Sequence, residues 1–162
     1  MKIKNQKSKI KSFGFTLIEL IVVVSVIVTL LGFITISLVR SQQTVSLTST
    51  EEILISELKQ QQLKSMIGDT EGRASSDSYG IHFDQAAYTL FHGAYSAGEA
   101  SNSVINLDSN MQFNNAPFDV IFSKKSGEIS SATIIKLQDN TNSSLKRIHL
   151  NIYGTVTQVE SL

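Results

Sequence analysis

One stretch of the chain decides how the rest is interpreted, and it reads KSFGFTLIEL over residues 11–20. The leader, residues 1–14, contains five lysines and no acidic residue, and an apolar run begins at Phe15, directly after Gly14. That run carries one early carboxylate, Glu19. An ordinary secretory signal peptide places its cleavage site after its apolar region. Here the basic leader and the glycine come first, which predicts an apolar segment that is retained after processing.

The apolar run is long enough, in sequence, to predict a membrane span. Residues 20–39 contain no charged side chain, and as a helix they would rise about 30 Å, the thickness of a bilayer's hydrocarbon core. The lysine-rich flank is expected to stay in the cytoplasm. The sequence therefore predicts a single-pass inner (cytoplasmic) membrane protein with its C-terminal domain outside the cytoplasm. Residues 15–39 would be the transmembrane and assembly half of a long N-terminal helix, in contact with membrane lipid.

Glu19 has two interpretations at this stage. A carboxylate near the end of a membrane helix can extend toward the interface and remain solvated there. Alternatively, it can meet a positive charge. Cleavage after Gly14 would create one in the α-amine of Phe15, about 6 Å from Glu19 along a helix axis. The amine of a neighbouring subunit could reach the same carboxylate in a bundle of staggered helices.

The run from Gly14 to Glu19 resembles the type IV prepilin signature, shared by pilins and by the pseudopilins of type II secretion and competence systems. The resemblance implies cleavage by a prepilin peptidase between Gly14 and Phe15, followed by N-methylation of Phe15. It also implies that Glu19 assists methylation and contacts the amine of a neighbouring subunit during assembly. Implied partners are other pilin or pseudopilin subunits, the peptidase and an inner-membrane assembly platform.

Composition narrows the function class. The chain of 162 residues has no cysteine, which excludes a disulfide framework, a thiolate metal site and a cysteine nucleophile. Without the five lysines of residues 1–14, nine basic residues remain against 14 acidic ones, a net charge of −5. A mildly acidic protein is poorly suited to general nucleic-acid binding. DNA is therefore an unexpected partner.

The second half of the chain changes its hydrophobic period. Residues 40–67 are predicted to form the amphipathic half of the helix, because the end of this segment contains an apolar stripe and Gly68 follows it. Residues 78–162 are predicted to form a β-rich soluble domain of short strands separated by turns. The predicted fold class is α+β, with the helix packed on an antiparallel sheet or sandwich. The expected strands are 79–84, 87–91, 103–108, 111–114, 118–123, 128–130, 133–137, 147–153 and 155–159.

A fainter resemblance comes from this β-rich half. The segments YGIHF at 79–83, YTLF at 88–91, GEI at 127–129 and IHLNIYGTV at 148–156 are similar to the GspH/FimT-type minor pilins and pseudopilins. This resemblance implies a type IV pilin-like fold, with a long helix against two antiparallel sheets, and a low-abundance subunit that helps to start assembly. Some FimT-type proteins bind DNA through arginines near the C-terminus, and residues 153–157 contain none.

Other candidate sites are weak. His82 and His149 alternate with apolar residues and are predicted to lie on the outer faces of strands. No histidine pair has metal-ligand spacing, so no metal or cofactor is expected. Residues 139–142 could ligate calcium or form an ordinary turn. The basic pairs at 124–125 and 146–147 are expected to be solvated.

The sequence thus predicts a minor structural subunit of a type IV pilus or type II secretion pseudopilus, and not an enzyme. Two alternatives remain open. One is a DNA-contacting minor pilin of a DNA-uptake pilus, with the basic pairs as its surface. The other is a signal-anchored exported enzyme, for which no catalytic set is visible.

Overall fold

The computed structural model describes residues 16–162, and within the helix it describes side chains over residues 16–32 and 45–67. The chain divides into two compact units, Met1–Ser41 and Gln42–Leu162, which are treated separately below. Gly14 and Phe15, the predicted processing and methylation residues, lie outside the described residues.

The helix α1 runs Leu17–Ile67, and both of its ends carry recognisable capping signals. Thr16 stands at its N-cap, where the first turn closes with Leu20 N donating to Thr16 O at 3.1 Å. At the other end, Gly68 has a φ of +68° and Asp69 N donates to Lys64 O at 3.0 Å. A left-handed glycine with this six-residue backbone bond is the Schellman arrangement, which ends a helix because only glycine adopts the required φ without strain.

The predicted membrane span requires correction. In the described part of the chain, no helix combines the length and the hydropathy needed to cross a bilayer. The predictions of a long membrane-spanning N-terminal helix and of a single-pass membrane location are therefore wrong on this finding, and the fold class reduces to α+β.

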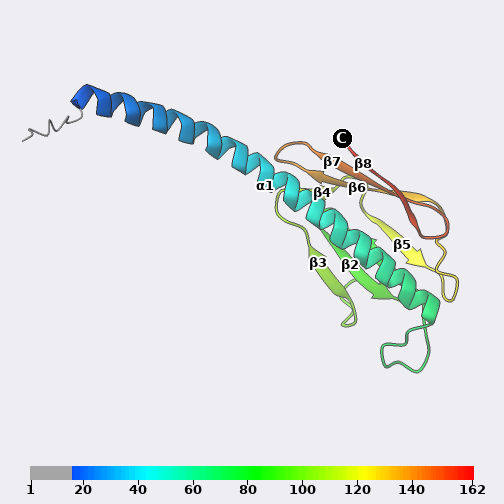
Figure 1. The fold of residues 1–162 in the computed structure, drawn as a ribbon. Coiled ribbons are helices and arrows are strands. Elements are labelled where there is room, and N and C mark those ends of the chain that lie inside the picture. Colours follow the sequence, from blue (N-terminus) through cyan, green and yellow to red (C-terminus); the bar gives the residue numbers. More distant parts are fainter. Residues whose placement is uncertain (1–15) are drawn as a thin grey trace, which may run out of the picture. The chain divides into compact units, whose positions relative to one another are not determined.

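The β-rich part forms two antiparallel four-stranded sheets (Figure 1). We call the sheet with the order β3-β2-β1-β5 sheet A and the sheet with the order β4-β6-β7-β8 sheet B. Residues 128–130, expected as a strand, form a loop in which Ile129 N donates to Ile152 O at 2.9 Å. The strands are β1 (Tyr79–Phe83), β2 (Ala87–His92), β3 (Ser103–Asn106), β4 (Met111–Phe113), β5 (Phe118–Phe122), β6 (Thr133–Asp139), β7 (Leu145–Leu150) and β8 (Val156–Ser161).

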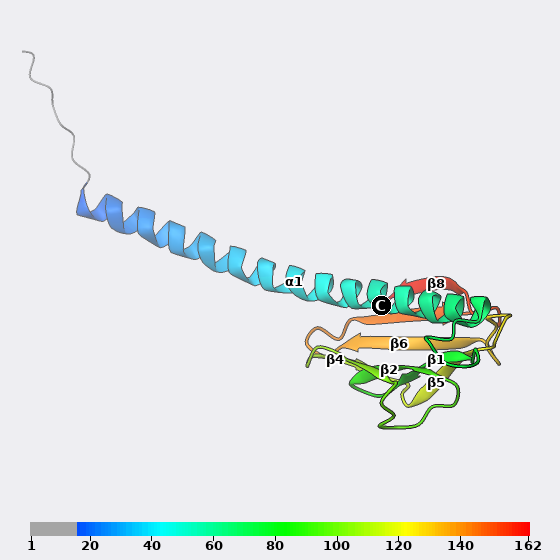
Figure 2. The ribbon, with the colours of Figure 1, turned by 90° about the horizontal axis from the view of Figure 1, so that it is seen from below.

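The core lies between the sheets and the C-terminal half of α1, which runs along them (Figure 2). The helix contributes Leu54 and Leu58, one turn apart and both nearly inaccessible to solvent. In β6, burial alternates as the pleat requires, and Ile135 and Leu137 lie on the inner face. Burying a side chain of this size stabilises the fold by about 1.5–3 kcal/mol. The buried strand residues are Tyr79, Ile81, Phe83, Tyr88, Phe91, Met111, Phe113, Val120, Phe122, Ile135, Leu137, Ile148 and Leu150.

Two polar side chains, one of them buried, connect the helix to both sheets. Ser65 is fully buried, and its Oγ donates to Phe122 O at 2.6 Å while it accepts from Tyr79 N at 2.9 Å. Gln62 Nε2 donates to Gly127 O at 3.0 Å and to Tyr153 O at 2.6 Å. These bonds reach sheet A and the β7–β8 turn of sheet B, so they set the position of this end of the helix on the domain.

Candidate functional site

Glu19 is the one predicted site residue whose side chain the structure describes, and it closes a capping box. Its backbone N–H donates to Thr16 Oγ1 at 3.2 Å, and its Oε2 accepts from Thr16 N and Thr16 Oγ1, both at 3.3 Å. A threonine at the N-cap with a glutamate three residues later satisfies two otherwise unpaired backbone donors. The Thr16-x-x-Glu19 spacing was visible in the sequence, and it indicates a local role for Glu19 that the sequence analysis missed.

The helix surface next to Glu19 is apolar and exposed. The large apolar side chains of residues 17–31 keep between 48% and 76% of their surface accessible. The two hydroxyls in this stretch are turned back onto the helix, with Ser25 Oγ donating to Ile21 O at 2.8 Å and Thr29 Oγ1 donating to Ser25 O at 2.6 Å. Glu19 is the only charged residue of the stretch. A continuous apolar surface of this kind marks a site of association.

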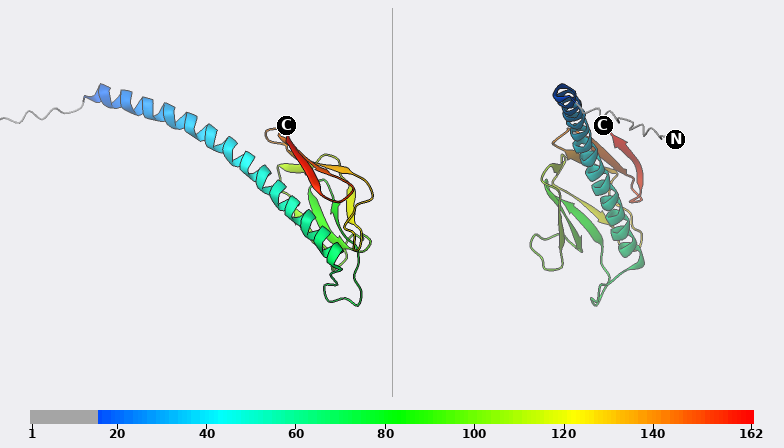
Figure 3. Two further views of the ribbon diagram at one scale, coloured as in Figure 1. Left: turned by 45° about the vertical axis from the view of Figure 1, so that its right-hand side comes forward. Right: turned by 60° about the vertical axis from the view of Figure 1, so that its left-hand side comes forward.

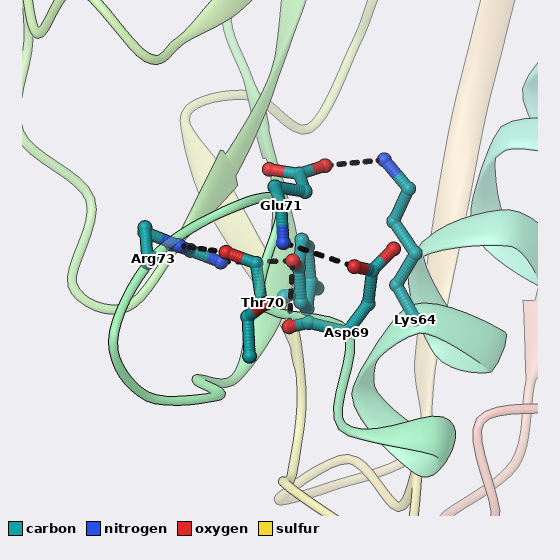
Figure 4. A network of polar contacts seen from close by, with 6 residues as sticks. Lys64, Asp69, Thr70, Glu71 and Arg73 are labelled. Atoms are coloured by element: carbon teal, nitrogen blue, oxygen red, sulfur yellow. Dashed lines mark hydrogen bonds and ion pairs between the residues drawn. The ribbon is translucent and has the colours of Figure 1, made fainter.

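A second polar cluster organises the loop that follows α1 (Figure 4). Lys64 Nζ pairs with Glu71 Oε1 at 2.6 Å, and Glu71 N donates to Asp69 Oδ1 at 2.9 Å. On the other side, Arg73 donates to Tyr79 OH at 2.8 Å, and Tyr79 OH donates to Asp69 O at 3.0 Å. Burial raises the pKa of the Tyr79 hydroxyl, and the nearby Glu71 carboxylate raises it further. The cluster binds the loop to β1: Lys64 and Glu71 form an ion pair, whereas Arg73 donates to neutral oxygens.

His82 contacts two carboxylates, Asp119 and Asp84, and one aromatic ring. Its Nδ1 lies 2.5 Å from Asp119 Oδ1, its Nε2 lies 3.4 Å from Asp84 Oδ1, and its ring stacks on Tyr95 at 3.8 Å between centroids. His149 lies 3.6 Å from Glu160 on the outer face of sheet B. Over residues 16–32 and 45–162, no group of three or more histidine, cysteine, aspartate or glutamate side chains is arranged to hold a metal ion. These histidines make contacts within the domain.

The turn at residues 139–142 bonds to its own backbone. Asp139 is fully buried, and its Oδ1 accepts from Thr141 N at 2.8 Å. Asn142 Oδ1 accepts from Ser144 N at 3.0 Å. Side-chain oxygens that accept from a backbone N–H two residues later form Asx-turns. The geometry is that of an ordinary β6–β7 turn.

The basic pairs are not freely solvated. Lys146 Nζ lies 2.9 Å from Glu51 Oε2, and both side chains are at least four-fifths buried between β7 and α1. Arg147 lies 3.7 Å from Glu160. Lys124 Nζ donates to Ser76 O at 2.8 Å. Three of the four cations that a DNA surface would need therefore have partners, and the expectation that both pairs are solvated is wrong for Lys146.

A shallow groove of about 640 Å³ lies on the outer face of sheet B. Its polar lining comes from Asn115, Lys136, His149 and Asn151, and Ile134 contributes apolar surface. The side chain of Asn115 already has partners: its Nδ2 donates to Ile134 O at 2.7 Å, and its Oδ1 accepts from Lys136 N at 3.1 Å. These are backbone groups of β6 that a further strand would otherwise pair with.

The comparisons with known proteins add nothing to this geometry: no family model matches the chain, and no match was found among the curated proteins or the solved structures.

Proposed function

We propose that this chain is a minor structural subunit of a type IV pilus or of a type II secretion pseudopilus. In this proposal a prepilin peptidase cuts between Gly14 and Phe15, Phe15 is N-methylated, and the subunit joins other pilin or pseudopilin subunits on an assembly platform through α1. The observation that carries the proposal is the exposed apolar surface of residues 17–31, which includes a single carboxylate, Glu19. It directly follows a basic leader that ends in glycine.

The exposed surface supports assembly through the helix for an energetic reason. Each large apolar side chain left in water forgoes about 1.5–3 kcal/mol of burial free energy. Helices from other subunits carry the same surface and can cover it side by side. Glu19 at the start of the helix would then be the only group in residues 17–31 that requires a charged or hydrogen-bonding partner.

Glu19 has a partner before processing and would gain another afterwards. In the intact chain its carboxylate caps the helix through Thr16. Cleavage after Gly14 would place a charged amine on Phe15, next to Thr16. A charged donor forms a stronger hydrogen bond with a carboxylate than a neutral one does. The proposal therefore gives Glu19 a capping role in the precursor and an amine-binding role in the assembled subunit.

The processing step is tested by intact-mass analysis after co-expression with a prepilin peptidase. The expected product lacks residues 1–14 and carries one added methyl group on Phe15. Gly14→Leu should block cleavage. Gly32→Leu is the matched control, because nothing lies within 4 Å of the Cβ position at Gly32. A product cut elsewhere, or equal cleavage of both variants, would refute the processing proposal.

The role of Glu19 is tested by comparing Glu19→Gln with Thr16→Val in an assembly assay. If the carboxylate binds an amine, Glu19→Gln should lower incorporation into the fibre while Thr16→Val assembles normally. If Glu19 serves only as a cap, Thr16→Val should be at least as harmful, because it removes the hydroxyl that two of the three Glu19–Thr16 contacts use. Equal defects in the two variants would therefore remove the amine-binding role.

The DNA-contacting alternative receives less support from the described contacts. Lys146 is held by Glu51, Arg147 lies near Glu160, and Lys124 is bonded to a backbone carbonyl. Residues 42–162 contain eight basic and 13 acidic side chains. A duplex phosphate backbone would meet a net negative domain, which weakens binding at physiological salt.

A further inference from the structure

The strand β8 leaves one backbone edge unpaired. Among the described residues it is hydrogen-bonded only to β7, and it forms the outer edge of sheet B (Figure 3). Leu162 and Leu145 exchange two backbone bonds, of 2.9 and 3.0 Å. Because hydrogen-bonded pairs alternate along an antiparallel ladder, Glu160 and Gln158 also bond to β7. The N–H and C=O groups of Val159 and Ser161 therefore point to the free edge.

This edge carries few of the features that normally prevent edge-to-edge pairing, and its β-bulge lies at one end of the strand. The segment VTQVESL over residues 156–162 contains no lysine and no proline, and it is rich in residues that favour strands. Val159 retains 36% of its surface and Leu162 retains 64%. The β-bulge opposite His149 leaves Thr157 as the extra residue of the strand, and the regular ladder extends from Gln158 onward.

The segment is also chemically symmetric about Val159. Read outward in both directions, it has a polar residue (Gln158 and Glu160), a hydroxyl residue (Thr157 and Ser161) and an apolar residue (Val156 and Leu162). Two copies placed antiparallel would therefore bring Val159 against Val159 of the other copy. Each Gln158 would oppose a Glu160, as an amide donor facing a carboxylate acceptor. Within one strand the same two groups already bond at 3.1 Å.

Charge selects this register over its neighbours. Sliding the strands by two residues in one direction places Glu160 against Glu160, and like charges directly opposite are destabilising. Sliding them the other way places Glu160 against the apolar Val156. The central register avoids both arrangements and uses the free backbone groups of Val159. We propose that β8 is a self-association edge, which joins two copies of this chain through sheet B into one continuous eight-stranded sheet about a two-fold axis.

The proposal concerns a second copy of this chain and is independent of assembly through α1. It is tested on the full chain by cysteine cross-linking. The protein has no cysteine of its own, so only the introduced cysteine can form a disulfide. The assay contains a mild detergent, which covers the apolar surface of residues 17–31 so that association through α1 does not contribute. Val159→Cys should form a disulfide-linked dimer, because the paired Cα atoms would lie about 5.5 Å apart. Val104→Cys, on the edge strand β3 and 60% exposed, is the matched control and should form far less.

Charge variants at Gln158 test the register without touching the backbone. Gln158→Lys should tighten the dimer and Gln158→Glu should weaken it, each by about 2- to 30-fold in Kd measured by sedimentation, because two symmetric pairs change together. Equal cross-linking at residues 159 and 104, or a Kd that does not respond to the charge at residue 158, would overturn the proposal. A chain that stays monomeric but cross-links through Val159→Cys to a different protein in cells would also overturn it, and would assign the edge to that protein.

Discussion

Ser65→Ala is the sharpest test of how α1 is held on the β-rich domain. The hydroxyl of Ser65 serves two backbone groups at once, as donor to Phe122 O and acceptor from Tyr79 N. Alanine leaves both groups buried and unpaired, at a cost of about 1–3 kcal/mol each. The higher helix propensity of alanine returns about 0.5 kcal/mol. The expected loss is about 2–5 kcal/mol, a large part of the 5–15 kcal/mol typical of a folded domain.

The free energy of unfolding is measured by urea titration with tyrosine fluorescence. All four tyrosines lie between Tyr79 and Tyr153, and the chain has no tryptophan, so the signal reports the unit formed by residues 42–162. Ser56→Ala is the matched control, because Ser56 is exposed on the same helix and should gain slightly in stability. If Ser65→Ala costs no more than Ser56→Ala, the two buried bonds do not hold the helix.

The remaining predictions concern a charge pair, a glycine and a buried hydroxyl. Lys146→Met should lose about 3–5 kcal/mol in the urea assay, because Glu51 is left charged and nearly buried, and adding Glu51→Gln should recover much of it. Gly80→Ala should lose about 1–3 kcal/mol, because its Cβ would lie 2.6 Å from Phe91 Cζ. Burial raises the pKa of the Tyr88 hydroxyl, so the stability that it contributes is complete below about pH 10 and is lost as the pH rises through the higher folded-state pKa. Tyr88→Phe should flatten that alkaline decline in the free energy of unfolding.

Each of these predictions has its own contrary result. A double variant of residues 51 and 146 that is no more stable than Lys146→Met would show that the two side chains are not coupled. Gly32→Ala, with open space at its Cβ position, is the control for Gly80→Ala, and equal losses would contradict the packing argument. An unchanged alkaline decline in Tyr88→Phe would assign the pH dependence to other groups.

Local chemistry in the sequence accounts for the ends of elements and for much of the strand pattern. Gly68 ends α1 because a left-handed φ favours glycine at that point. The strand at residues 79–83 follows from its β-branched and aromatic residues, and it pairs antiparallel with the strand predicted after the Asp84 turn. These features depend on neighbours a few residues away, which a sequence displays directly. The Thr16 capping box belongs to the same class, although its meaning was overlooked.

The predicted membrane span shows where a local pattern is insufficient. An uncharged run over residues 20–39 is a hydropathy signal, whereas no helix in the described part of the chain has the length and hydropathy of a membrane span. Among the described residues, the apolar surface of residues 17–31 is exposed to solvent. Its exposure, together with the capped Glu19, is a property of the folded chain.

Contacts between distant residues were decided by the tertiary structure alone. Period-two alternation says which face of a strand a residue occupies, but not which element packs on that face. Lys146 therefore looked like half of a solvated basic pair until β7 placed it against Glu51, and His82 looked isolated until β5 brought Asp119 beside it. Ser65 is one polar residue among several on α1, and only the approach of β1 and β5 makes it a buried bridge. The sequence by itself determined the end of the helix at Gly68 and the approximate positions of most strands. The pairing of sheets and helix determined which polar groups are buried, because burial depends on segments that are far apart along the chain.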